Sequence, residues 1–243
     1  MKKLFFVHVP KTAGNSVRQA MRNKNLLTNP GYEKKEREHH FAKKNAKRIV
    51  GQHLSFKTPF FPSYSELKAY KEADFSFSII RNPYDVLVSY YSHYIDNSKK
   101  KNWIDNGWAN VNGYHGFSCF DEFIEYYCTC ESEDWHIPNL NKNLFCQLYN
   151  ETNQSIVDYA IYFDDLENNL NFFLEKVLKV NSSVRLEKKN VSSLKKVSYE
   201  EYYNDYTKKL VSKKCQKLLE AFNFNFGKKS TNKIKLIKGL KYE

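Results

Sequence analysis

The stretch LFFVHVPKTAGNSV, residues 4–17, decides the fold of this chain. Residues 4–9 are mostly large and apolar, which is typical of a strand buried on both faces, and Pro10 ends that run. Small or polar residues follow, and a helix-compatible segment begins at Ser16. A strand, a tight loop and a helix in this order gather backbone N–H groups at the helix N-terminus, where an anion can bind.

The loop between this strand and this helix carries residues that suit a phosphate-type group. Lys11 supplies a positive charge, Gly14 permits close approach of the backbone, and Ser16 is suited to cap the helix or donate its hydroxyl. A Walker A loop needs Gly-Lys-Ser/Thr at its end, which is absent here, so an ATP-binding P-loop is disfavoured. An ordinary strand-to-helix turn that carries a lysine fits the same residues. The loop also contains Thr12, Ala13 and Asn15.

A second informative stretch is FSFSIIRNPYDVLVSYYSHY, residues 75–94. Residues 75–80 predict another strand, and the Asn-Pro pair shortly after it predicts that a helix follows. Arg81 therefore stands at the carboxyl end of a strand, where open α/β sheets bind ligands. Its guanidinium, together with the hydroxyl of Ser89, suits a terminal phosphate monoester. The alternative is an ion pair between Arg81 and Asp85 inside the fold.

Taken together, PKTAGNS at residues 10–16 and RNPYDVLVS at residues 81–89 resemble two motifs of the PAPS-dependent sulfotransferases, in the branch of carbohydrate sulfotransferases. In that family the first motif binds the 5′-phosphosulfate of PAPS, and the Arg and Ser of the second bind the 3′-phosphate. The chain departs from the family at Asn15, usually Thr, and at Val86, often Arg. The resemblance implies PAPS as co-substrate, PAP as product, and as binding residues Lys11, Thr12, Ala13, Gly14, Asn15, Ser16, Arg81 and Ser89.

The resemblance also implies the fold. It continues more weakly in three later segments, residues 159–178, 188–193 and 199–227. Predicted strands alternate with predicted helices, which argues for a parallel sheet flanked by helices. We therefore expect an α/β chain with a P-loop-like parallel sheet, the sulfotransferase fold, in a single domain over residues 1–227. Residues 228–243 are expected to form a basic C-terminal tail.

Local patterns predict further elements. The apolar run 159–163 predicts a strand, and Ser118, as the start of a capping box with Asp121, predicts a helix over 120–127. A second box, Ser198 with Glu201, predicts another capped helix. The remaining helices are expected at residues 16–25, 39–49 and 65–72, from residue 84, at 166–179 and, as one long helix, at 205–222.

Sulfuryl transfer requires a base, because the acceptor hydroxyl loses a proton. A base that titrates near neutrality is favoured, which points to His. His53 lies in GQHLSF after an apolar pair that predicts a strand, and sugar 2-O-sulfotransferases place a catalytic His in a similar segment. The expected catalytic residues are His53 as base and Lys11, which neutralises the charge that develops on the leaving phosphate. A structural role for His53, or a base at His39 or His40, remains open.

The composition is compatible with a sulfotransferase but does not distinguish it from other classes of protein. The formal charge of +12 suits an anionic cofactor, an anionic polymer, nucleic acid or a membrane surface. The sequence has no RNA-binding signature, zinc-finger spacing or homeodomain pattern, so no nucleic-acid partner is expected. Five scattered cysteines form neither a disulfide framework nor a zinc site, so no metal is expected.

No segment has the length of a membrane helix or the form of a signal peptide, which favours an enzyme that works in the cytoplasm. The expected acceptor is a hydroxyl group on a glycan, a glycolipid or a small molecule. Two other classes stay open. One is a P-loop-type nucleotide kinase that uses ATP, and the other is a non-catalytic basic module that binds glycan or nucleic acid.

Overall fold

A computed structural model of the chain describes residues 4–22, 24, 71–98, 117–129, 144–145, 148–149, 154–181, 183–187 and 197–240. The chain divides into two compact units. We call residues 1–80, 145–189 and 231–243 the sheet unit, and residues 81–144 and 190–230 the helical unit. The predicted single-domain boundary at residue 227 stays a prediction.

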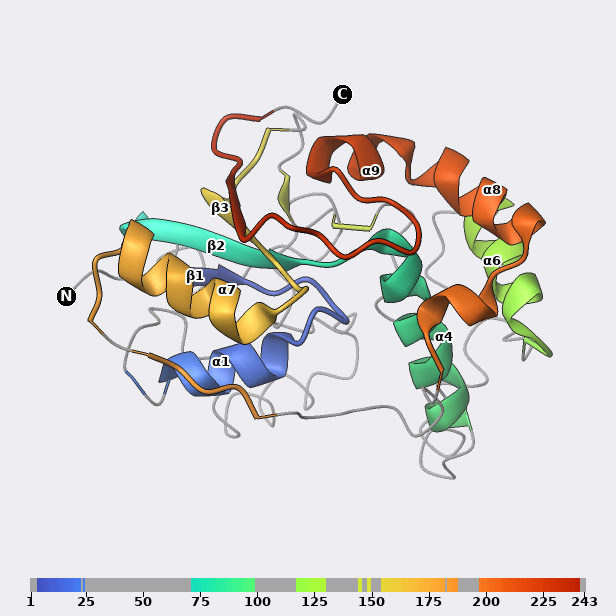
Figure 1. Ribbon diagram of the computed structural model, residues 1–243, viewed down its shortest axis with the longest axis horizontal. Coiled ribbons are helices and arrows are strands. Elements are labelled where there is room, and N and C mark those ends of the chain that lie inside the picture. The colour runs from blue at the N-terminus through green and yellow to red at the C-terminus, as the bar shows by residue number, and fades with distance from the viewer. Residues whose placement is uncertain are drawn as a thin grey trace, which may run out of the picture. The chain divides into compact units, whose positions relative to one another are not determined.

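The sheet unit contains a four-stranded sheet in the order β1-β2-β3-β4 (Figure 1). The strands β1 (Leu4–Val7), β2 (Phe75–Ile80) and β3 (Tyr159–Tyr162) are parallel, whereas β4 (Ile234–Leu236) is antiparallel to β3. All four side chains of β1 are buried, as expected of a strand in a parallel sheet. The expected α/β class with a mostly parallel sheet is confirmed.

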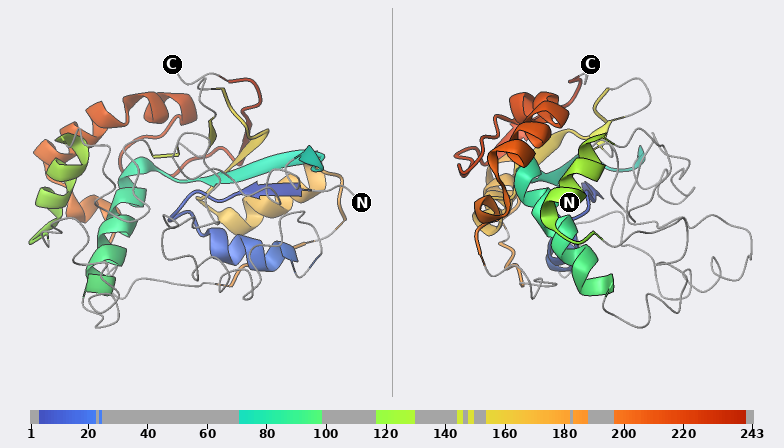
Figure 2. Two further views of the ribbon diagram at one scale, coloured as in Figure 1. Left: turned by 180° about the vertical axis from the view of Figure 1, so that it is seen from behind. Right: turned by 90° about the vertical axis from the view of Figure 1, so that its right-hand side faces the viewer.

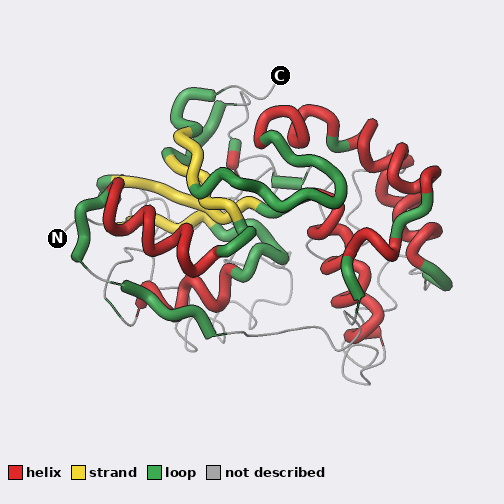
Figure 3. The backbone as a smooth tube through the Cα atoms, viewed as in Figure 1, coloured by secondary structure: helices red, strands yellow, loops and turns green. Residues whose placement is uncertain are grey.

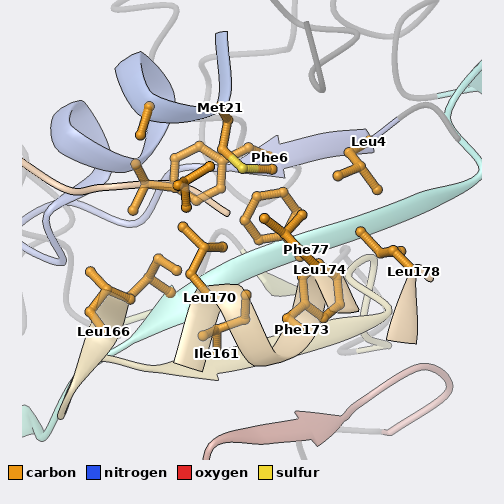
Figure 4. Packing of buried hydrophobic residues seen from close by; sticks show 14 residues of the cluster. Leu4, Phe6, Met21, Phe77, Ile161, Leu166, Leu170, Phe173, Leu174 and Leu178 are labelled. Carbon is orange, nitrogen blue, oxygen red and sulfur yellow. The ribbon is translucent and has the colours of Figure 1, made fainter. Parts of the chain in front are cut away.

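Two helices cover one face of this sheet, α1 (Gly14–Arg22) and α7 (Leu166–Phe172), as Figure 1 and Figure 2 show. Figure 4 shows the core between them: Phe6 of β1 stacks on Phe77 of β2, with ring centroids 5.0 Å apart. Each buried side chain of this size stabilises the fold by about 1.5–3 kcal/mol. The core is completed by residues of α1, of α7 and of the helical turn that directly follows α7, which include Val17, Met21, Leu166, Leu170, Phe173 and Leu174.

β1 ends at Val7, two residues before the predicted end. The hydroxyl of Ser78 on β2 donates to the carbonyl oxygen of Val7 at 2.7 Å, and the hydroxyl of Thr12 donates to the carbonyl of Val9 at 2.7 Å. The second bond folds the chain back on itself around Pro10, which has no N–H to continue a ladder. The strand therefore ends at Val7, before the apolar run 4–9 ends.

The predicted helix over 166–179 changes its hydrogen-bond pattern midway. α7 is followed directly by a π-helix, η2 (Phe173–Val177), and the N–H of Leu178 donates to the carbonyl of Phe173 at 3.2 Å. Such i to i−5 bonding occurs mostly as a single turn inside helical segments. The wider turn keeps Phe173 and Leu174 in the core, where both are fully buried.

The described residues of the helical unit form α4 (Pro83–Ser98), α6 (Phe120–Thr129), the 3₁₀ helix η3 (Tyr199–Tyr202), α8 (Asp205–Lys214) and α9 (Gln216–Phe222). The prediction of one helix over 205–222 is wrong, because Cys215, with φ −104° and ψ 12°, interrupts it between α8 and α9. Figure 3 shows the resulting pair of helices in red. Within the described part of the chain, no helix combines the length and the apolar character needed to cross a membrane.

One of the two predicted capping boxes is confirmed. Ser198 and Glu201 cap η3 reciprocally. The other prediction paired Ser118 with Asp121, and it is wrong: the Ser118 N–H and hydroxyl both donate to the Glu122 carboxylate, at 2.8 and 2.7 Å. Asp121 instead accepts from the side chain of Asn204 at 2.8 Å, a residue far away in the sequence.

The basic segment after residue 227 contributes β4, which its sequence did not predict. The carbonyl of Lys233 accepts the N–H of Tyr162 at 3.0 Å, and the N–H of Ile237 donates to the carbonyl of Asp158 at 2.8 Å. The Ile237 side chain is fully buried. This part of the expected tail is therefore integrated into the sheet.

Asp158 lies directly before β3, and we expect it to contribute more to the stability of the fold than its ion pair with Lys238 alone would provide. Its carboxylate accepts the N–H and hydroxyl of buried Ser76, at 2.8 and 2.9 Å, as well as exposed Lys238 at 3.1 Å. We expect Asp158→Ala to lower the free energy of unfolding by about 2–3 kcal/mol, since it leaves a buried donor unsatisfied. Lys238→Ala should cost less than about 1 kcal/mol. Urea denaturation of both variants checks this, and equal losses would contradict it.

Candidate functional site

The loop after β1 has an unusual backbone. Lys11 and Ala13, which flank Thr12, both have positive φ angles, 65° and 60°. For residues with a Cβ atom this left-handed conformation costs about 1–2 kcal/mol each. Such strain persists only where the surroundings enforce it, and it is common at ligand sites. Here the buried Thr12 side chain enforces it through its hydrogen bond to Val9.

α1 begins at Gly14, two residues before the predicted start. The carbonyl of Ala13 accepts the N–H groups of Ser16 at 3.0 Å and Val17 at 3.2 Å, so Ala13 stands at the cap position. The expectation that Ser16 caps the helix is therefore wrong: it is the third helical residue, and it is buried. The N–H groups of Gly14 and Asn15 belong to the first turn, which has no acceptors of its own for them. This is the geometry in which helix N-termini bind anions.

Gly14 is needed for space rather than for its φ angle. A Cβ atom at this position would lie 1.9 Å from Cδ2 and 2.0 Å from Nε2 of His8. The His8 ring is buried and stacks on Phe6, with centroids 5.8 Å apart. The imidazole thus lies directly against the first residue of α1.

In the helical unit, Arg81 is buried and its Nε lies 2.6 Å from Oδ2 of Asp85. The ion pair that was the alternative to phosphate binding is therefore present. It uses one of the five N–H donors of a guanidinium, so the pair and a role in anion binding are compatible. Asp85 lies in the first turn of α4.

Ser89 and Asp85 are four residues apart on α4, and residues at this spacing share one face of a helix. The half-buried Ser89 side chain therefore lies on the face that carries the partner of Arg81. Asn82 is a residue of this segment that sequence reasoning did not select. The sequence feature that could have identified Asn82 is its position directly before Pro83, because Asn is a favoured residue at the N-cap of a helix.

Several predicted residues cannot be placed. His53, the expected base, and its competitors His39 and His40 lie outside the described residues. Lys11 and the other loop residues belong to the sheet unit, whereas Arg81 and Ser89 belong to the helical unit. Among the described residues, no group of three or more His, Cys, Asp or Glu side chains is arranged to hold a metal ion.

Comparison with known proteins identifies one family. The model of the sulfotransferase family matches residues 1–226, which is most of the chain. No curated protein matches the sequence.

Proposed function

The chain belongs to the sulfotransferase family, and from this membership we propose that it transfers the sulfuryl group of PAPS to a hydroxyl group, on a sugar of a glycan or glycolipid. One observation carries the proposal. The segment PKTAGNS, which resembles the PAPS-binding loop of the family, forms the strained end of the loop after β1, residues 10–13, and the first three residues of α1, 14–16. Strand, loop and helix N-terminus are the parts that an oxyanion site requires.

The loop is proposed to bind the 5′-phosphosulfate. During transfer the acceptor oxygen bonds to sulfur while the bond from sulfur to the phosphate oxygen breaks, so negative charge grows on the 5′-phosphate of PAP. Lys11 and the N–H groups of Gly14 and Asn15 would stabilise that charge, with Thr12, Ala13 and Ser16 shaping the loop. Fixed donors of this kind act mainly on the transition state.

The second segment is proposed to bind the 3′-phosphate. The Arg81 guanidinium supplies charge and several donors, and Ser89 supplies a hydroxyl from the same face of α4 as Asp85. The Asp85 carboxylate, 2.6 Å from Nε of Arg81, fixes the orientation of the guanidinium. A preoriented guanidinium binds a phosphate with less loss of side-chain entropy.

Binding measurements test the donor. Isothermal titration is carried out with PAP and with ATP, each with and without Mg²⁺. We expect tight binding of PAP and none of ATP, and the affinity for PAP should not depend on Mg²⁺. Arg81→Ala should abolish PAP binding, whereas a non-catalytic basic module would keep its affinity for anions. Transfer of labelled sulfate from PAPS to a panel of glycans and small hydroxyl compounds then identifies the acceptor. Tight binding of Mg-ATP without binding of PAP would overturn the proposal.

We further propose His53 as the base that removes the acceptor proton. His53→Ala should lower kcat by about 10²–10⁴-fold, the usual contribution of general base catalysis, and leave the Kd of PAP within about twofold. His39→Ala and His40→Ala serve as matched controls with unchanged turnover. Loss of activity in either control, with full activity of His53→Ala, would assign the base to the control position instead.

A further inference from the structure

The chain that follows α9 passes close to the start of α4 (Figure 1), and the side chain of Asn82 joins the two. Nδ2 of Asn82 donates to the carbonyl of Asn225 at 2.8 Å and, at 3.4 Å, to the hydroxyl of Tyr199. The same Tyr199 hydroxyl accepts the N–H of Gly227 at 2.7 Å. One amide and one phenol thus join the beginning of α4 to residues 225–227.

The other end of the Asn82 side chain caps α4. Oδ1 accepts the N–H of Tyr84 at 3.3 Å, and the backbone carbonyl of Asn82 accepts the N–H of Val86 at 2.9 Å. An amide offers an acceptor and two donors on one rigid plane, so it can cap a helix and bind a distant carbonyl at once. The donor end therefore fixes where the first turn of α4 lies relative to residues 225–227.

Residues 225–227 are themselves held firmly. The ring of Phe226 meets the rings of Tyr84 and Tyr203 edge to face, with centroids 5.0 and 5.5 Å apart. The Tyr203 hydroxyl donates to the carbonyl of Tyr84 at 2.9 Å. Burial raises the pKa of Tyr203 well above its usual value, so this phenol stays protonated and remains a donor at neutral pH. Phe226 thus packs this segment against the first turn of α4 and against Tyr203.

The first turn of α4 carries Asp85, so the position of this turn affects the orientation of Arg81. The Asp85 carboxylate contacts Nε of Arg81 at 2.6 Å, and both side chains are largely buried. A small displacement of the first turn would therefore move the carboxylate that orients the guanidinium. The hydrogen bonds form one connected path from residues 225–227 through Asn82 and the start of α4 to Arg81.

We propose that Asn82 is a positioning residue for phosphate recognition: by joining the cap of α4 to residues 225–227, it orients the Arg81 guanidinium toward the 3′-phosphate of the nucleotide. This inference rests on the proposed function, in which Arg81 binds that phosphate. It assigns to residues 225–227, which are far from Arg81 in the sequence, an indirect influence on nucleotide affinity.

The test compares two nucleotides that differ by the group in question. Asn82→Ser keeps a good helix cap but is too short to reach the Asn225 carbonyl. We expect this variant to bind PAP about tenfold more weakly, as for one lost hydrogen bond, and to bind AMP, which lacks the 3′-phosphate, within about twofold of wild type. Tyr199→Phe, which keeps the ring but loses the hydroxyl, should show the same pattern with a smaller change.

A pair of glycines supplies a matched control. Gly227 and Gly239 have similar positive φ angles, +70° and +77°, and a Cβ atom added to either meets nothing closer than 3.8 Å. Alanine therefore imposes a similar backbone strain at both positions. Gly227→Ala should weaken PAP binding and leave AMP binding intact, because its N–H bonds to Tyr199, whereas Gly239→Ala should change neither.

The outcomes separate the two proposals. A wild-type protein that does not bind PAP overturns the proposed function and this inference with it. A wild-type protein that binds PAP, with Asn82→Ser and Tyr199→Phe binding it equally well, overturns the positioning role alone. Equal loss of PAP and AMP binding, together with a lowered melting temperature, reduces Asn82 to a structural role and also overturns the inference.

Discussion

Lys11→Ala is expected to slow sulfate transfer from PAPS by about 10²–10³-fold, the usual cost of removing one preorganised donor from an oxyanion site. Lysine and alanine bear the same Cβ, so the left-handed backbone at φ 65° is equally strained in both. The change therefore removes the ammonium group without altering the loop strain. Because the charge is needed most when the phosphate leaves, kcat should fall further than the affinity for PAP. Steady-state kinetics with PAP titration gives both quantities.

The control for this variant is Lys24→Ala. Lys24 is exposed just after α1, and its removal lowers the net charge by the same amount. Screening at physiological ionic strength limits the effect of such a charge on a distant ligand to a small factor. Equal losses in the two variants would mean that Lys11 acts only through the overall charge of the protein, and its assigned catalytic role would then be wrong.

Gly14→Ala is expected to abolish PAP binding and to lower the free energy of unfolding by about 1–3 kcal/mol, the typical cost of overpacking a buried site. The added methyl group would lie 1.9 Å from the His8 ring, so either the ring or the start of α1 has to move. Either shift displaces the first-turn N–H groups proposed to face the phosphosulfate. Urea denaturation and PAP titration measure the two effects independently.

A second substitution at His8 tests the reason for this loss. In His8→Ala/Gly14→Ala the ring is absent, so the methyl group has room, and the double variant should be more stable than the sum of the two single losses predicts. Contacting residues commonly show coupling of about 0.5–3 kcal/mol. Strict additivity would show that Gly14 is required for another reason, and the contact with His8 would lose its importance.

The sequence was sufficient to predict those parts of the fold that local patterns determine. The apolar run of β2 has the predicted bounds, and the Asn-Pro pair after Arg81 marks the start of α4 as expected. The parallel arrangement followed from the alternation of strands and helices. These features depend on residues that are neighbours in the chain, so composition and spacing report them directly.

Features that depend on distant partners were missed. β4 has only three residues, too few for a periodic pattern, and it is a strand because β3 offers it hydrogen bonds. The interruption at Cys215 has no Gly or Pro to announce it. Asn82 owes its second role to Asn225, which is 143 residues away, and no local signal could reveal that partner.

The position of β4 has a practical consequence for protein expression. The family match ends at residue 226, so a chain shortened there is an obvious choice for recombinant work. It would leave one side of β3, a row of buried apolar residues, with unpaired N–H and carbonyl groups. Exposed strand edges of this kind recruit strands from other molecules and promote aggregation. By pairing with β3, the last residues are therefore expected to protect the sheet from self-association.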